Sequence, residues 1–308
     1  MKAQVIAWWL VGLGLLTPGM ASAYCRTTTC DQTTTACATD PDDRQCVVDG
    51  VPLQWPIGCV GVSLNEKASV QVSYADFLRV ATAAFDAWNK VSCEGQTPSI
   101  STTILGPVVC DEQQFNDEKG NANIVLFRDD DWPYTGQSSV LALTTLTFGV
   151  KTGIIYDADM EIRAKPGDVR LTTSDEDVDT DLQSIITHEA GHFLGLAHTS
   201  VAEATMLPYY PPKSTKFRSL EADDAAGLCA AYPHDRAGVP ACDPGGPSPR
   251  SLGLSSQCGG ADVVAKDSDS GCGCRAVASG PTPGAGLGGV LGALGMGGLL
   301  RRRRRASR

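Results

Sequence analysis

Hydrophobic side chains between residues 74 and 91 recur at the three- and four-residue spacing of one helical face. Ser73, directly before them, has the side chain of a good N-cap. We therefore predict an amphipathic helix over residues 74–91. Its apolar face is formed by Phe77, Leu78, Ala81, Ala84, Phe85 and Trp88.

Two other segments also have helical character. Residues 181–197 form the first, and acidic residues lie near its start, where the positive end of the helix dipole favours them. Residues 220–232 form the second, which is the last helix that we expect in the chain.

Short runs of apolar and β-branched residues predict the strands of a sheet. Residues 51–64 contain the first strand, although Pro and Gly interrupt the run. Residues 124–127 have the pattern of a short buried strand. The Thr-rich run at residues 140–150 and the run at residues 153–162 predict two more strands.

The first 23 residues have the features of a secretory signal. Lys2 supplies a positive start, residues 6–16 form an apolar core, and Ala21-Ser22-Ala23 is a typical cleavage site. A transmembrane anchor is the alternative, but the apolar run is short for a membrane span. We therefore expect export and a mature chain that begins at Tyr24.

Two changes of composition divide the C-terminal part of the chain. Residues 236–280 are rich in Pro, Gly, Ser and Asp, which is typical of a flexible linker. Residues 281–308 contain an uncharged Gly-rich hydrophobic stretch and then five consecutive arginines. That order suits either a stop-transfer anchor or a soluble polybasic tail.

The segment S-G-C-G-C-R at residues 270–275, the Gly-rich stretch and the terminal arginines together resemble a MYXO-CTERM sorting tail. The resemblance implies bacterial export, processing near Cys272 and Cys274, and retention at the cell surface or outer membrane. We expect residues from Cys272 onward to serve sorting and to take no part in catalysis.

All 12 cysteines follow the predicted signal, and an even number in an exported chain indicates disulfides. Residues 24–50 are Cys-rich with little periodicity, which is typical of a disulfide-pinned leader. Cys93 and Cys110 flank the loop after the first helix and form a candidate bridge. Cys229 is a candidate for tying the N-terminal segment to the core. The full connectivity is left open.

The chain is acidic, with a net charge of −10. Without the lysine of the signal and the six arginines of the tail, 18 basic residues face 35 acidic ones. Such a surface excludes nucleic acid as a favoured partner. It favours solubility outside the cell and some binding of cations.

Residues 188–198 read H-E-A-G-H-F-L-G-L-A-H. His188 and His192 are four residues apart, so on a helix both imidazoles lie on one face. Gly195 tolerates a positive φ and allows a turn that brings His198 round as a third ligand. Three imidazoles leave one position of a tetrahedral zinc ion open for water, which is the mark of a catalytic site.

Met206 follows eight residues after His198, in A-T-M-L-P-Y-Y, at the place of a Met-turn. There a soft methionine lies beneath the zinc without being a ligand. The extended histidine pattern with this methionine resembles the metzincin metalloproteases. Further segments narrow the resemblance to the matrixin branch. They are A-A-F-D-A-W at residues 83–88, Y-D-A-D-M-E at 156–161, P-Y-Y at 208–210, and L-E-A-D-D at 220–224 followed by Gly227 and Tyr232.

The resemblance implies an α+β catalytic domain at residues 51–235, with a twisted mixed β-sheet, an active-site helix and a C-terminal helix. It also implies that Pro208 and Tyr210 wall the main substrate pocket. Matrixins usually have Ser after the third histidine, where this chain has Thr199. They usually hold a second zinc largely through histidines. Only His234 is left over here, so we expect that second site to be absent.

Asp157, Asp159 and Glu161 alternate, so on a strand they share one face. Hard carboxylate oxygens at that spacing suit calcium, which matrixins bind near this position. A solvated strand face is the alternative. Matrixin zymogens block their zinc with a pro-segment thiolate, but the motif around Cys46 does not match, and a disulfide is the better interpretation of that cysteine.

We expect a secreted, monomeric zinc endopeptidase that acts on protein or peptide substrates. A zinc-activated water would attack the peptide bond, with Glu189 as general base. The alternative is a non-enzymatic surface pseudo-protease that binds without cleaving. An intact Glu189 favours the enzyme, because a degenerate module tends to lose its base first. A purely structural zinc is a third interpretation, but three ligands argue against it.

Overall fold

The computed structural model describes residues 24–31, 36–43, 46–115, 121–134, 139–239, 258 and 273–277. The predicted signal, Cys272, most of the predicted linker, and the hydrophobic and arginine-rich parts of the tail lie outside the described residues. No helix within the described part is both long and apolar enough to cross a membrane.

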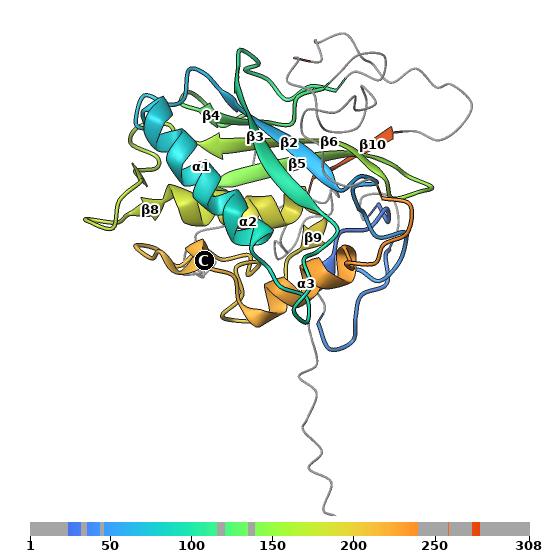
Figure 1. Cartoon of the computed structure of the whole chain (residues 1–308). Coiled ribbons are helices and arrows are strands. Elements are labelled where there is room, and N and C mark those ends of the chain that lie inside the picture. Colours follow the sequence, from blue (N-terminus) through green and yellow to red (C-terminus); the bar gives the residue numbers. More distant parts are fainter. Residues whose placement is uncertain are drawn as a thin grey trace, which may run out of the picture.

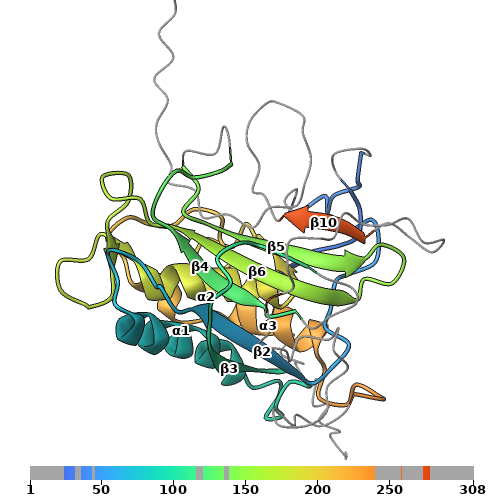
Figure 2. The ribbon, with the colours of Figure 1, turned by 90° about the horizontal axis from the view of Figure 1, so that it is seen from above.

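A mixed β-sheet forms the centre of the domain (Figures 1 and 2). Strands β2, β3, β4 and β6 run parallel to one another, and β5 runs antiparallel to β6. The strand order is β10-β5-β6-β4-β2-β3. In chain order these strands are β2 (Cys59–Asn65), β3 (Ser101–Val108), β4 (Ile124–Arg128), β5 (Ala142–Gly149), β6 (Ile155–Arg163) and β10 (Gly273–Val277).

The described strands match the predicted ones in most places. Strands β2, β4, β5 and β6 coincide with the four predicted runs to within a few residues. Strand β3 was not predicted, because Gly and Pro interrupt its S-T-T-I-L-G-P-V sequence; in the structure it is only half-buried. The described residues also form four two-residue strands: β1 (Cys25–Arg26), β7 (Leu171–Thr172), β8 (Thr180–Asp181) and β9 (Leu196–Ala197).

Strand β10 was not expected, because residues 236–280 were predicted to be a linker. It pairs antiparallel with β5, with Gly273 opposite Gly149 and Val277 opposite Thr145 (Figure 2). An edge strand offers unpaired backbone groups that any extended segment can satisfy, whatever its hydrophobic pattern. That is why a Gly-rich segment without periodicity can join the sheet.

Helices α1 (Tyr74–Asn89) and α2 (Leu182–Phe193) pack against each other beside the sheet, and α3 (Ala222–Ala231) follows a short 3₁₀ turn, η1 (Lys216–Arg218) (Figure 1). The predicted cap of α1 is confirmed, because the Ser73 hydroxyl accepts a hydrogen bond from the Asp76 amide. Leu78 was placed on the apolar face of α1, but it is exposed and Val80 is buried instead.

The start of α2 is anchored by buried polar groups. Asp181 is its N-cap and accepts a hydrogen bond from the Ser184 amide at 2.8 Å. Arg218 donates to both carboxylate oxygens of Asp181, at 2.9 and 2.6 Å. In this ion pair the Asp181 side chain is fully buried. An arginine that contacts both oxygens of a carboxylate fixes the relative orientation of the two side chains. The N-terminus of α2 is therefore held in one orientation.

Aromatic side chains hold the rest of α2 in the core. The indole of Trp88, on α1, donates to the Thr187 carbonyl at 2.8 Å. The indole of Trp55 donates to the Phe193 carbonyl at 2.8 Å. The Phe193 ring lies 5.5 Å from the rings of both Trp55 and Phe85. All of these side chains are buried, so α2 is fixed at both of its ends and along one side.

The disulfides correct the predicted pairings. Cys93 bonds Cys229 and thus joins the loop after α1 to α3, while Cys110 bonds Cys258. The predicted Cys93–Cys110 bridge is therefore wrong, and Cys229 does not reach the N-terminal segment. The partners lie more than a hundred residues apart in sequence, and only the packing of α3 beside the α1 loop brings the first pair together.

Within the N-terminal segment, which comprises residues 24–50, two further disulfides close short loops. They join Cys25 to Cys46 and Cys30 to Cys37. The predicted disulfide role of Cys46 is confirmed. The segment also pairs with the domain, because β1 runs antiparallel to β9 directly after α2 (Figure 1).

Replacing Trp88 with Ala should destabilise the fold by about 3–5 kcal/mol, because it removes a large buried side chain and its hydrogen bond to α2. Thr82, which is exposed on the same helix, provides the matched control. Thr82→Ala should change the free energy of unfolding by less than about 0.5 kcal/mol. Urea denaturation followed by circular dichroism measures both variants, and equal stabilities would contradict the role given to Trp88.

Candidate active site

Helix α2 places two imidazoles side by side, and a turn brings up a third. His188 Nε2 lies 3.1 Å from His192 Nε2, and each lies 3.2 Å from His198 Nε2. All three side chains are buried. Four tetrahedral ligands at the usual zinc–nitrogen distance lie about 3.3 Å apart, so the three nitrogens fit one zinc ion.

Gly195 makes this convergence possible. It follows the end of α2 with φ of +83°, a left-handed conformation that glycine adopts without strain. A Cβ at this position would also lie 2.6 Å from the Leu53 carbonyl oxygen. The chain therefore reverses, passes through β9 and returns His198 to the face of α2.

The other ring nitrogens of the helical histidines face carbonyl oxygens. His188 Nδ1 donates to the Thr205 carbonyl at 2.7 Å, and His192 Nδ1 donates to the Leu196 carbonyl at 2.9 Å. With the proton on Nδ1, each Nε2 presents a lone pair to the centre of the cluster. Lone pairs that converge at this distance repel one another unless a cation lies between them. The donor set thus suits a metal ion.

Burial keeps the imidazoles neutral. It lowers the pKa of His192 to about 4 and lowers the pKa of His188 and His198 well below the usual histidine value. Desolvation is the largest cause at each histidine, because the charged form loses its water. Neutral imidazole is the form that binds metal.

Glu189 is fully buried beside this cluster. One of its carboxylate oxygens, Oε2, accepts a hydrogen bond from the Thr144 hydroxyl of β5 at 2.6 Å. Among the described residues, its other oxygen, Oε1, has no hydrogen-bond partner. Burial raises the pKa of Glu189 to about 8, although the Thr144 hydrogen bonds act in the opposite direction. A carboxyl group buried in this way holds its proton more tightly than an exposed one.

Met206 lies directly beneath α2, where the Met-turn interpretation puts it. A Cβ at Gly191 would come within 2.2 Å of the Met206 sulfur and 2.8 Å of the Trp88 ring. Gly191 is therefore required for the close approach of this methionine to the helix. The Thr199 amide donates to the Met206 carbonyl at 3.1 Å, which ties the segment after His198 to the same turn.

Asp224 on α3 holds this turn in place. Its carboxylate accepts hydrogen bonds from the amides of Thr205 and Met206, at 2.8 and 3.0 Å, and from the amide of Glu221 at 2.8 Å. Because the Thr205 carbonyl in turn orients His188, α3 acts on the first ligand through two hydrogen bonds. Neither Asp224 nor Thr144 was assigned this role from the sequence, because only the fold brings them to the site.

The predicted pocket residues follow the Met-turn. Pro208 is buried, and Tyr210 is buried with its hydroxyl accepting from the Asp181 amide at 2.9 Å and donating to the Ser214 carbonyl at 2.6 Å. Tyr210 thus ties this segment to the start of α2. Whether Pro208 and Tyr210 also wall a substrate pocket stays a prediction.

The three acidic residues proposed for calcium lie on β6 with their side chains buried. Asp159 accepts from the amides of Gln114 and Ile124 at 2.9 and 3.0 Å. Glu161 forms a salt bridge with Arg128 at 2.5 Å and accepts from the Tyr134 hydroxyl. These contacts contradict a solvated strand face, and they engage two of the carboxylates with protein donors.

Within the described ranges, metal-ligand atoms converge in two groups, the three histidines and a set of Cys25, Asp43 and Cys46. The acidic residues of β6 form no such group there, so calcium stays a prediction. The fourth histidine, His234, is exposed and does not belong to the histidine cluster.

Comparisons with known proteins agree with this geometry. Residues 62–233 match the family model of the matrixins. The chain is 31% identical over 165 residues to neutrophil collagenase of Homo sapiens, which covers 53% of the chain and 30% of the collagenase. It is 36% identical over 100 residues to metalloendoproteinase 4-MMP of Arabidopsis thaliana, which covers 32% of the chain and 27% of that protein.

Matrix metalloproteinase-C of Caenorhabditis elegans is 28% identical over 175 residues, or 54% of the chain and 27% of that protein. The chain thus spans about a third or less of the length of these relatives. The match to the family model nevertheless covers more than half of the chain and includes α1, the central strands, the histidine cluster, the Met-turn and α3. The chain belongs to the matrixin family.

Proposed function

We propose that the protein is a zinc-dependent endopeptidase in which Glu189 is the general base. The observation that carries this proposal is the position of Glu189, buried beside three converging imidazoles with one carboxylate oxygen free of partners in the described structure. Such an arrangement provides three metal ligands and a base in one place, and it would leave one position of a bound zinc ion open.

His188, His192 and His198 would hold the zinc ion. When bound, zinc supplies a Lewis acid and lowers the pKa of a bound water from 15.7 to about 7. Thr144 holds Glu189 Oε2 by a hydrogen bond, which leaves Oε1 to take the proton of the attacking water. Glu189 then passes that proton to the amine of the leaving peptide. No side chain is required to form a covalent bond with the substrate.

The substrate would bind as an extended strand along the outer edge of β5. Thr144 of β5 contacts Glu189, so this edge runs beside the reacting centre. Strand β10 already pairs with that edge in antiparallel register as far as Thr145 (Figure 2). Its pairing supports the idea that the edge accepts an extended peptide through backbone hydrogen bonds.

We also propose that the protein is secreted and then retained at the bacterial surface by its C-terminal tail. The supporting features are the signal-like first 23 residues and the sorting-tail pattern after residue 270. The structure adds that Cys258 belongs with the catalytic domain, because it is bonded to Cys110. The proposed sorting tail therefore begins after Cys258.

The zinc proposal predicts one tightly bound zinc ion per chain. His192→Ala should lose zinc and activity together, because two imidazoles hold the ion much more weakly than three. His234→Ala is the matched control, since this exposed histidine lies outside the cluster, and it should retain one equivalent. Elemental analysis after dialysis measures both variants. Two zinc equivalents in the wild-type protein would contradict the expected loss of a second site.

The role of Glu189 predicts that Glu189→Ala retains zinc but hydrolyses peptides at least ~10²-fold more slowly, because the attacking water loses its proton acceptor. Glu203→Ala, which removes an exposed carboxylate, should leave the rate unchanged. Cleavage of an internally quenched peptide library measures the rates. If zinc-loaded wild-type protein cleaves nothing, the pseudo-protease alternative is favoured.

Strand β10 leads to a prediction about truncation. Ending the chain after Gly260 keeps the Cys110–Cys258 disulfide but removes β10. A tethered strand competes at a high effective concentration with an added peptide, so the truncated protein should show a higher kcat/KM. It should also be released into the medium. A lower kcat/KM would show that β10 supports the catalytic domain rather than competing with substrate.

A further inference from the structure

The N-terminal segment contacts the chain on both sides of His198. On the upstream side, β1 pairs with β9, so that Cys25 lies opposite Ala197, the residue before the third histidine. The Thr27 amide donates to the Gly195 carbonyl at 3.0 Å. The reversing turn that delivers His198 is therefore paired, residue by residue, with the N-terminal segment.

Thr27 also acts close to the second histidine. Its hydroxyl donates to the Leu196 carbonyl at 2.9 Å, and the same carbonyl accepts from His192 Nδ1 at 2.9 Å. Thr27 is buried. One carbonyl oxygen thus links the N-terminal segment to the orientation of His192.

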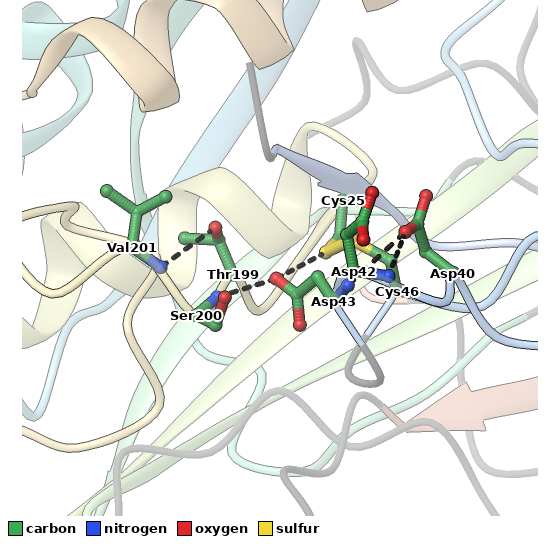
Figure 3. Close-up of a disulfide and its surroundings, with 8 residues drawn as sticks. All are labelled: Cys25, Asp40, Asp42, Asp43, Cys46, Thr199, Ser200 and Val201. Carbon is green, nitrogen blue, oxygen red and sulfur yellow. Dashed lines mark hydrogen bonds between the residues drawn. A yellow bond between two sulfur atoms is a disulfide. The ribbon is translucent and has the colours of Figure 1, made fainter. Parts of the chain in front are cut away.

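On the downstream side, Asp43 holds the segment that follows His198 (Figure 3). Its carboxylate oxygen Oδ2 accepts from the Ser200 amide at 2.8 Å, and the side chain is only 5% exposed. Thr199, between His198 and Ser200, is itself tied to the Met-turn by its amide. The backbone amides of both residues that follow His198, Thr199 and Ser200, are therefore held by hydrogen bonds.

Hydrogen bonds among Asp40, Asp42, Asp43 and Cys46 position the Asp43 carboxylate. The Asp40 side chain accepts from the amides of Asp42 and Asp43, at 2.8 and 3.2 Å, and the Cys46 amide donates to the Asp43 carbonyl at 2.9 Å. The Cys25–Cys46 disulfide then joins this turn to β1, as Figure 3 shows. The upstream and downstream contacts are thus covalently connected.

We propose that residues 24–50 form a disulfide-closed clamp that fixes the third zinc ligand, and that Asp43 is a positioning residue for His198. The proposal rests on the proposed zinc enzyme. His198 is the one ligand that α2 does not carry, so its position depends on the loop that follows Gly195. The ligand atoms of Asp43, Cys25 and Cys46 also lie close together, as in a metal site. The two cysteine sulfurs are bonded to each other, however, so they are not thiolates that could bind a metal.

The clamp explains why the N-terminal segment lacks any hydrophobic periodicity. Its contribution comes from backbone pairing, one buried carboxylate and a disulfide rather than from an apolar face. Hydrogen-bonding groups around metal ligands typically change metal affinity or activity by 10–100-fold when they are removed. We expect an effect of that order at Asp43.

The first experiment measures the zinc dissociation constant of the mature full chain with a competing chromophoric chelator. Asp43→Ala should weaken zinc binding by about 10–100-fold, because the loop after His198 loses its anchor. Asp43→Asn should bind nearly as tightly as wild type, since its side-chain oxygen still accepts from the Ser200 amide. Asp42→Ala, in the same turn but exposed, is the matched control and should bind as wild type.

The second experiment tests the covalent link. Replacing both Cys25 and Cys46 with Ser should weaken zinc binding and broaden the visible spectrum of the cobalt-substituted protein, because His198 becomes less ordered. Replacing both Cys30 and Cys37 with Ser removes the neighbouring disulfide of the same segment and should change neither measurement. Comparing the two double variants shows whether zinc binding depends on the Cys25–Cys46 disulfide itself or on disulfides in this segment generally.

Both measurements use metal binding, so they remain informative if the wild-type protein cleaves no peptide and the proposed enzyme function fails. Zinc binding by Asp43→Ala that equals wild type would overturn the clamp. The clamp would also be overturned if Asp43→Ala and Asp42→Ala lost zinc affinity equally. An equal loss of zinc affinity in the Cys25 and Cys46 variant and the Cys30 and Cys37 variant would have the same consequence. If Asp43→Ala does not fold, the Cys25 and Cys46 double variant, measured in parallel, decides between these outcomes.

Discussion

The whole domain depends on bringing three buried imidazole nitrogens to within 3.2 Å of one another. Helix α2 supplies two of them from a single face, which costs little because residues four apart are already neighbours. The third must come from outside the helix. A left-handed turn at Gly195 reverses the chain so that His198 returns to the same point. The rest of the structure can be understood as support for this convergence.

Several elements hold α2 and the Met-turn beneath it in place. The Arg218–Asp181 pair fixes its start, and the indoles of Trp88 and Trp55 fix its carbonyls. Beneath it, Asp224 holds the Met-turn. These supporting residues come from the loop before β2, from α1, from η1 and from α3, so elements far apart in the sequence meet at one short helix. A site built on a rigid helix keeps its ligands better aligned than a site built on loops alone.

Both ends of the described chain also converge on this site. The N-terminal segment pairs with the loop that carries His198, and β10 lies along the strand that contacts Glu189. These two regions have little hydrophobic periodicity, so neither resembles a folded element in sequence. Backbone hydrogen bonds and disulfides place them instead, since these interactions need only a free strand edge or two nearby thiols. The regions outside the matrixin core thus pair with elements that carry residues of the candidate active site.

The sequence by itself determined the parts of this protein that depend on short spacing. The i and i+4 histidines, the glycine before His198, most of the buried face of α1 and the apolar runs of β2, β4, β5 and β6 are local patterns, and the structure has them close to where they were expected. Tertiary packing alone decided the disulfide partners, the contact of Thr144 with Glu189, the hold of Asp43 on Ser200 and the pairing of β10. These contacts join residues separated by tens to hundreds of positions, and nothing in a local pattern specifies which distant groups will share one buried space. Only the folded chain, which brings those groups together and excludes water from them, selects the partners.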